Sequence, residues 1–80
     1  MNPHAAALLY ILAADGRTSA PDLIDALGME KTGVHRYLGW LHRAGFVDMD
    51  VATSTRGACA RHYTATTTGL AWAAREQVAA

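Results

Sequence analysis

Residues 23–47 of this 80-residue chain read LIDALGMEKTGVHRYLGWLHRAGFV, and they decide the fold. Three apolar residues recur there at the spacings of one helix face: Val34, Leu38 and Leu41. They predict a helix over about residues 31–44, which Gly45 ends with a left-handed C-cap. Only two residues separate that helix from Gly28, where an earlier apolar segment stops. The stretch therefore predicts two helices joined by a tight turn.

The residues before this stretch predict one further helix and the start of the helix that ends at Gly28. Residues 3–14 begin with a proline, which a first helical turn tolerates, and place apolar side chains three and four positions apart. Ser19, with Asp22 three positions later, is typical of a helix N-cap and predicts a second, short helix that ends at Gly28.

On the C-terminal side the apolar period changes to two. Val47 begins an alternation of apolar and acidic residues, and a second alternation follows around Tyr63, which together predict a two-stranded hairpin over about residues 46–65. Thr66 is placed as the N-cap of a last helix, over about residues 67–79. A weak apolar stripe is expected on that helix, at Leu70, Ala73, Ala74, Gln77 and Val78. The predicted class is α+β, mostly α.

Residues 23–47 closely resemble a motif of the MarR, IclR and related bacterial regulators, in which a leucine-glycine turn precedes a recognition helix ending in alanine-glycine. Residues 63–69, YTATTTG, resemble the pattern that these families place between the wing and the last helix. The resemblance implies a single winged helix-turn-helix domain over residues 1–80, with three helices, a two-stranded wing and a C-terminal helix. Glu30 departs from the pattern, because the families usually have a Ser or Thr N-cap there.

The charges are balanced overall but unevenly distributed. Seven Lys and Arg face seven Asp and Glu, so the net charge alone does not indicate a nucleic-acid partner. Residues 31–62, however, hold five basic residues against Asp48 and Asp50, a local net charge of +3, together with three histidines. One face of the domain is therefore expected to be basic.

The implied helix-turn-helix geometry places the N-terminal part of the recognition helix in the major groove. Arg36 is our main candidate for reading a base, because a guanidinium matches guanine O6 and N7. Lys31 and Arg43 are expected on phosphates, and Arg56 at the wing tip suits a narrow minor groove. Gly33 would either let the backbone approach DNA or be neutral. The predicted DNA-binding residues are Lys31, Thr32, Gly33, His35, Arg36, Arg43, Arg56 and Arg61.

The sequence thus predicts sequence-specific binding of double-stranded DNA by a small stand-alone transcriptional regulator, a repressor. The alternative is a winged-helix adaptor that binds protein within a larger complex, which the zero net charge and Glu30 favour. A homodimer through the first and last helices is also expected, with contacts at Leu9, Leu70 and Trp72, although Trp72 could instead fold over the first helix.

Enzymatic activity and a bound cofactor or metal are not expected. Cys59 is the single cysteine, so the chain has neither an internal disulfide nor a multi-cysteine zinc site, and it contains no phosphate loop or nucleophile motif. The sequence also lacks the long apolar run of a membrane span and the cationic start of a signal peptide. A cytoplasmic protein without a small-molecule substrate is the expectation.

Overall fold

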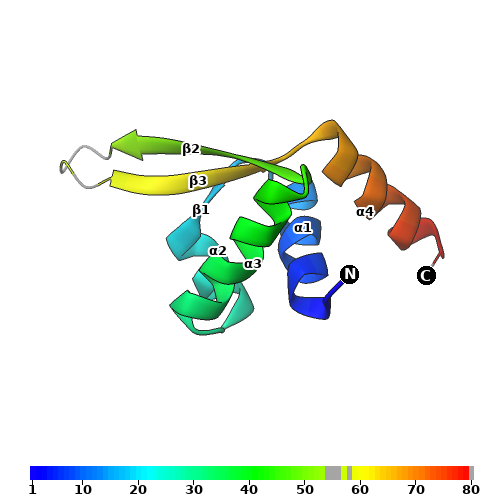
Figure 1. Ribbon diagram of the computed structural model, residues 1–80, viewed down its shortest axis with the longest axis horizontal. Coiled ribbons are helices and arrows are strands. Elements are labelled where there is room, and N and C mark those ends of the chain that lie inside the picture. Colours follow the sequence, from blue (N-terminus) through cyan, green and yellow to red (C-terminus); the bar gives the residue numbers. More distant parts are fainter. Residues whose placement is uncertain (54–56, 58, 80) are drawn as a thin grey trace.

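Three helices pack beneath a small antiparallel sheet, and a fourth helix extends from one end of it (Figure 1). The computed structural model describes residues 1–53, 57 and 59–79. Its elements are α1 (Pro3–Asp15), β1 (Thr18–Ser19), α2 (Ala20–Leu27), α3 (Lys31–Arg43), β2 (Val47–Thr53), β3 (Cys59–Ala65) and α4 (Thr67–Ala79). This is the mostly helical α+β fold that the sequence predicts.

The helix ends are set by local hydrogen bonds that the sequence indicates. Ser19 Oγ accepts from the Asp22 N–H at 3.3 Å, which confirms the predicted N-cap of α2. At the C-terminal end of α3, Gly45 adopts a φ of 84°. The Gly45 N–H donates to the His42 carbonyl, and the Phe46 N–H donates to the Leu41 carbonyl. This pair of bonds is a Schellman motif, which ends α3 and turns the chain into β2.

The sheet has three strands in the order β1-β3-β2, all antiparallel. Strands β2 and β3 form the predicted hairpin, with Val47 opposite Ala65 and Thr53 opposite Cys59. The two-residue strand β1, which pairs with β3 at Tyr63 and His62, was not predicted, because two residues carry no periodicity. Strand β1 attaches the loop between α1 and α2 to the base of the wing.

The core lies between α1, α2, α3 and the base of the sheet. Its largest fully buried side chains are Leu8, Leu9, Leu12, Leu23, Val34, Leu38, Leu41 and Val47. The predicted apolar faces of the first and third helices are therefore confirmed. The stripe predicted for the last helix is partly wrong: Ala73 is buried, but Leu70 is 46% exposed and Ala74 is exposed. Helix α4 turns Gly69, Ala73 and the half-buried Trp72 inward instead.

Helix α4 is fixed to the turn after α3 by the residues at its start. Thr66 Oγ1 accepts from the Gly69 N–H at 3.1 Å, as expected of an N-cap, and donates to the Gly45 carbonyl at 2.7 Å. The Thr66 N–H also donates to the Phe46 carbonyl at 3.0 Å. A Cβ on Gly69 would overlap that same carbonyl oxygen, so α4 approaches the turn at a distance that only glycine allows.

A surface ion pair joins the loop after α1 to the wing. Arg17 donates from Nε and Nη2 to the two carboxylate oxygens of Asp50, at 3.2 and 2.5 Å. These hydrogen bonds lower the pKa of Asp50 below its usual value, and Coulomb attraction to Arg17 and His62 acts in the same direction. No helix within the described ranges has the length and apolar content needed to cross a membrane.

Candidate nucleic-acid interface

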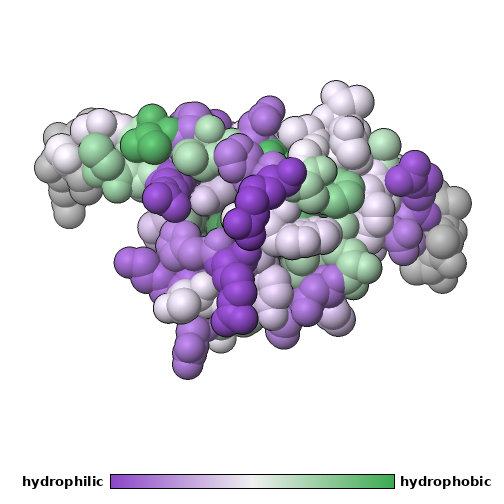
Figure 2. Space-filling model, viewed as in Figure 1, coloured by the Kyte–Doolittle hydropathy of each residue, from purple (hydrophilic) through white to green (hydrophobic). Residues whose placement is uncertain are grey.

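The outward side of α3 carries most of the predicted contact residues. Val34, Leu38 and Leu41 are fully buried, which fixes the rotation of the helix about its axis. The opposite side then presents Lys31, Thr32, Arg36 and Arg43 as exposed residues, while Gly33 and His35 are half-buried. In Figure 2 a hydrophilic band crosses the middle of the molecule, where Figure 1 draws α3.

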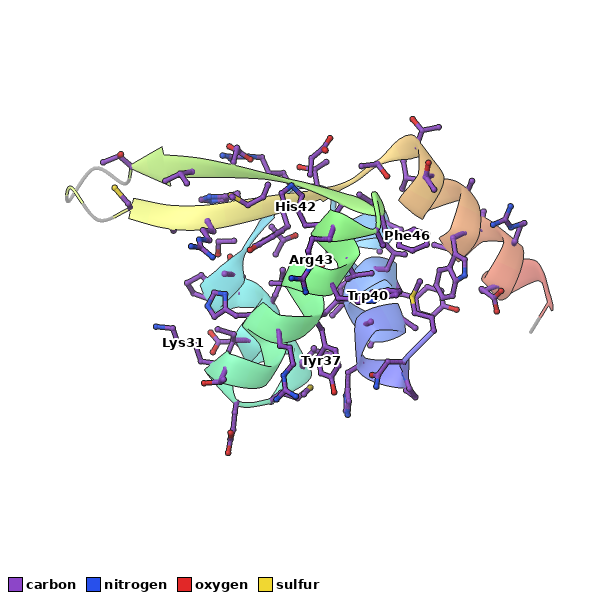
Figure 3. All side chains as sticks on the ribbon, in the orientation of Figure 1. Lys31, Tyr37, Trp40, His42, Arg43 and Phe46 are labelled. Carbon is purple, nitrogen blue, oxygen red and sulfur yellow. The ribbon has the colours of Figure 1, made fainter. Side chains whose placement is uncertain are left out.

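A hollow of about 400 Å³ lies between α2, α3 and β3, and we call it the wing-side hollow. Its basic lining residues are Lys31 and His35 of α3 and Arg61 of β3, beside Pro21 and Ile24 of α2. Within the described part of the chain, no acidic residue lines it. Figure 3 shows the Lys31 side chain directed away from α1, toward this side of the domain. The fold thus gathers basic groups from two segments that lie far apart in the sequence.

The register of β3 explains the position of Arg61. Side chains two residues apart in a strand share a face, so Arg61 lies on the same face as Tyr63 and Ala65. Tyr63 and Ala65 are buried against the helices at the base of the wing. Arg61 lies two residues before Tyr63, toward the far end of the hairpin. It remains exposed beside the end of α3 that carries Lys31.

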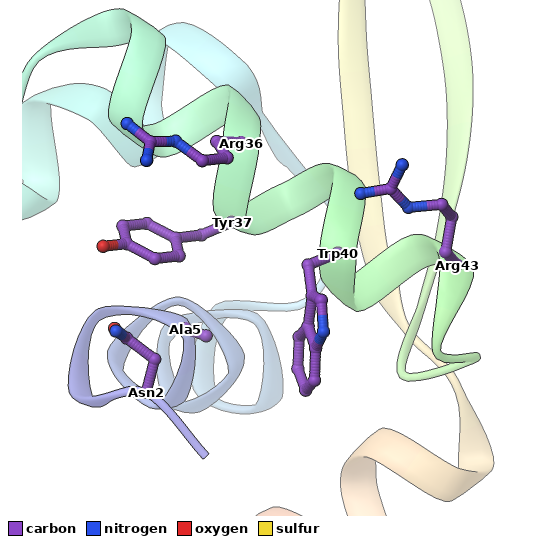
Figure 4. Close-up of a pocket in the computed structure, with 6 residues that line it drawn as sticks. All are labelled: Asn2, Ala5, Arg36, Tyr37, Trp40 and Arg43. Atoms are coloured by element: carbon purple, nitrogen blue, oxygen red, sulfur yellow. The ribbon is translucent and has the colours of Figure 1, made fainter.

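Arg36 and Arg43 border a second hollow, of about 320 Å³, between α1 and α3. We call it the α1-side hollow. Figure 4 shows their guanidinium groups on the α3 side, with the Tyr37 and Trp40 rings between α3 and α1. Four of the predicted contact residues of α3 therefore border the two hollows, with Lys31 and His35 on one and both arginines on the other, whereas Thr32 and Gly33 line neither.

The beginning of α3 has the weak cap that the sequence indicates. Glu30 occupies the N-cap position and makes no side-chain capping bond. A Cβ on Gly33 would lie 3.3 Å from Met29 Cε, the end of a flexible side chain. A backbone contact between Gly33 and DNA stays a prediction.

Arg56, predicted at the wing tip, lies outside the described residues. Gly57 beside it has a φ of 81°, in the left-handed region that favours glycine. The strands β2 and β3 extend away from the helices toward this end of the hairpin (Figure 1).

The residues predicted for a dimer contact have different environments. Leu9 is fully buried inside the single chain, so it is a core residue and its assignment to a surface contact is corrected. Trp72 is half-buried and packs on Tyr10 of α1, with ring centroids 5.7 Å apart. This is the alternative in which Trp72 folds over the first helix. Leu70 remains 46% exposed on α4.

Cys59 and His62 do not lie within a metal-binding group. In the parts of the chain that the structure describes, no three His, Cys, Asp or Glu side chains are close enough together to hold a metal ion. His62 Nδ1 lies 3.1 Å from the Ala60 carbonyl oxygen, and Cys59 Sγ lies 3.6 Å from Thr53 Oγ1. Both side chains thus have local hydrogen-bond partners.

Several solved structures share this fold at low sequence identity. The transcriptional regulator homologue from Pyrococcus horikoshii OT3 superposes with a TM-score of 0.83 at 18% identity, covering 92% of this chain and 72% of that one. A mutant of MarR from E. coli, complexed with operator DNA, gives 0.82 at 17% identity, covering 94% and 52%. The adhesin competence repressor AdcR from Streptococcus pyogenes gives 0.82 at 17% identity, covering 96% and 54%. The chain thus spans about half the length of the last two proteins.

The sequence itself matches one family model. No curated protein sequence matches the chain. The model described as winged helix-turn-helix DNA-binding matches residues 1–48, which contain α1, α2, α3 and the start of β2. Those residues are more than half of the chain and include the whole of the helix-turn-helix. The chain therefore belongs to the winged helix-turn-helix DNA-binding family.

Proposed function

We propose that this protein binds double-stranded DNA in a sequence-specific manner and acts as a small transcriptional regulator, a repressor that occludes a promoter. Membership of a DNA-binding family supports binding in general. The observation that carries the proposal is the wing-side hollow, where Lys31, His35 and Arg61 come together and none of the described lining residues is acidic. A surface of this charge, formed by the recognition helix and the wing, is complementary to a phosphate backbone.

In this proposal α3 enters the major groove with its N-terminal half. Arg36 is exposed there and reads a guanine through two hydrogen bonds, while Thr32 lies beside it on the same exposed side. Lys31, Arg43 and Arg61 contact phosphates and set the register of the domain on DNA. Arg56 inserts into the minor groove. This role of Arg56 is inferred from the sequence alone.

The regulatory part of the proposal draws on the similar structures. The E. coli MarR mutant is described in complex with operator DNA, and the S. pyogenes protein is described as a repressor. We infer the same type of activity for this chain, as one domain over residues 1–80 acting in the cytoplasm. We also infer a homodimer, supported by the exposed Leu70 on α4. A two-fold dimer would read two half-sites about one helical turn of DNA apart.

The salt dependence of binding tests the phosphate contacts. Each such contact releases counterions, so the binding constant K falls as the salt concentration rises. Replacing one lysine or arginine should make the negative slope of log K against log salt shallower by about 1. We expect this decrease for Lys31→Gln and for Arg61→Gln on a pool of random duplexes, measured by fluorescence anisotropy. Arg75→Gln, on the exposed surface of α4, is the matched control and should leave the slope unchanged. Slopes unaltered by the first two substitutions would refute the assigned roles and favour a protein partner.

A further inference from the structure

The α1-side hollow has a composition that DNA contact alone does not explain. Its lining combines two cations, two aromatic rings, one small apolar residue and one amide: Arg36, Arg43, Tyr37, Trp40, Ala5 and Asn2. Figure 4 shows the Tyr37 and Trp40 rings extending from α3 toward α1, where Ala5 and Asn2 lie. Its volume of about 320 Å³ is enough for one large apolar side chain.

The aromatic walls are held in place by neighbouring rings. Trp40 stacks on Phe46 with ring centroids 6.0 Å apart, and Tyr37 packs on His4 at 5.6 Å. Trp40 nevertheless remains 44% exposed. A partly exposed tryptophan that is already ordered costs little conformational entropy on binding, and Trp, Tyr and Arg are the residues most enriched at binding hot spots.

The two arginines have no acidic partner among the described residues, where the one ion pair is that of Arg17 with Asp50. Among the residues that the structure describes, none with a carboxylate lines the hollow. Arg36 and Arg43 are seven positions apart on α3, which places their Cα atoms about 10.5 Å apart along the helix axis. Two carboxylates that are two helical turns apart on another helix have the same separation.

From this charge complementarity we propose that the α1-side hollow binds an acidic amphipathic helix of a partner protein. One aromatic or leucine side chain of the partner enters between Tyr37 and Trp40, and carboxylates on either side of it pair with Arg36 and Arg43. Helix-in-groove recognition places apolar anchors from one face of a helix into a groove. The α1-side hollow has room for one such anchor, and the two arginines supply the charged contacts beside it. Because the pairing engages Arg36 and Arg43, the partner and DNA exclude one another. This last consequence rests on the proposed function, whereas the helix site does not.

The test uses the full chain without DNA and a displayed library of helical peptides, randomised on one face. We expect the enriched peptides to carry an aromatic residue or leucine between two acidic residues about seven positions apart. Affinity for the best peptide should fall about tenfold in Trp40→Ala and severalfold in Arg43→Gln, and Arg75→Gln should not change it. Thermal unfolding of each variant shows whether it is folded. If Trp40→Ala does not fold, the double substitution Arg36→Gln and Arg43→Gln replaces it.

Three results would overturn the proposal: no enrichment, enriched peptides without acidic residues, or binding that survives loss of Trp40 or of both arginines. A change in the sedimentation mass of the chain alone on replacing Trp40 would assign the hollow to a second copy and overturn it as well. Titrating duplex DNA into the peptide complex separates the two proposals. Displacement of the peptide supports both. Peptide binding with no DNA binding at all refutes the proposed function and leaves the helix site standing.

Discussion

Replacing Gly69 by alanine should destabilise the protein, although Gly→Ala inside a helix normally stabilises it by up to about 1 kcal/mol. The new Cβ would overlap the Phe46 carbonyl oxygen and lie 3.1 Å from Leu9 Cδ1. The Phe46 carbonyl accepts from the Thr66 N–H and lies on the backbone that leads into β2, so it cannot rotate away and α4 must move. That movement weakens the bonds from Thr66 to the Gly45 and Phe46 carbonyls. Overpacking of this kind costs about 1–3 kcal/mol, which we expect as the net loss.

Gly39→Ala is the matched control. Gly39 lies within α3, where a Cβ would meet nothing within 4 Å, so the substitution should stabilise the chain by about 1 kcal/mol. The two variants should therefore differ by about 2–4 kcal/mol, or roughly 10 °C or more in Tm for a domain of this size. Thermal and urea unfolding followed by circular dichroism measure the difference. If Gly69→Ala is as stable as Gly39→Ala, the close approach of α4 to Phe46 is wrong.

Three further predictions concern caps, charge and assembly. Ser19→Ala removes the acceptor of the Asp22 N–H and should cost about 0.5–2 kcal/mol in urea unfolding; no loss would mean that this cap is unimportant. Because Arg17 lowers the pKa of Asp50, the pair stabilises the fold above the unfolded pKa of about 3.9, and this contribution disappears as the pH falls through the lower folded value. Asp50→Asn should therefore be slightly less stable than wild type at about pH 7, and the difference should shrink as the pH falls below about 3.9. A constant difference would contradict the pairing. Leu70→Lys should convert a dimer to a monomer in sedimentation, whereas an unchanged mass would exclude α4 from the contact.

Much of the fold follows from local sequence signals. The apolar period of α3, the glycine after it and the serine before α2 each specify their element through contacts within a few residues. Thr66 is recognisable as a cap for the same reason. These signals are strong because capping and helix periodicity depend on neighbouring residues and not on the rest of the fold.

The features that the sequence did not reveal depend on distant contacts. Strand β1 exists because β3 lies beside it, and two residues cannot carry a period. The inward side of α4 is set by Gly69, whose significance comes from the Phe46 carbonyl and not from hydrophobicity. Leu70, the largest apolar residue of the predicted stripe, is consequently left exposed.

In the candidate site, too, the individual residues follow from the local sequence, whereas their arrangement depends on distant contacts. The sequence identified Lys31, His35 and Arg61 separately, but their grouping depends on the register of β3 against β1 and β2. The α1-side hollow could not be predicted either, because it requires Ala5 of α1 and Asn2, which caps that helix, to lie opposite Trp40. A pattern on one helix gives its exposed face but not what the neighbouring element places beside it.

Selection from a library of random DNA duplexes tests the central claim most directly. The wild-type chain and Arg36→Ala are each incubated with the library at roughly physiological salt, and the retained duplexes are sequenced. We predict that the wild-type chain enriches a motif containing a required guanine, and that Arg36→Ala keeps the motif but loses the preference at that position. The account is contradicted if the wild-type chain enriches no sequence at this salt concentration and retains no DNA at low salt.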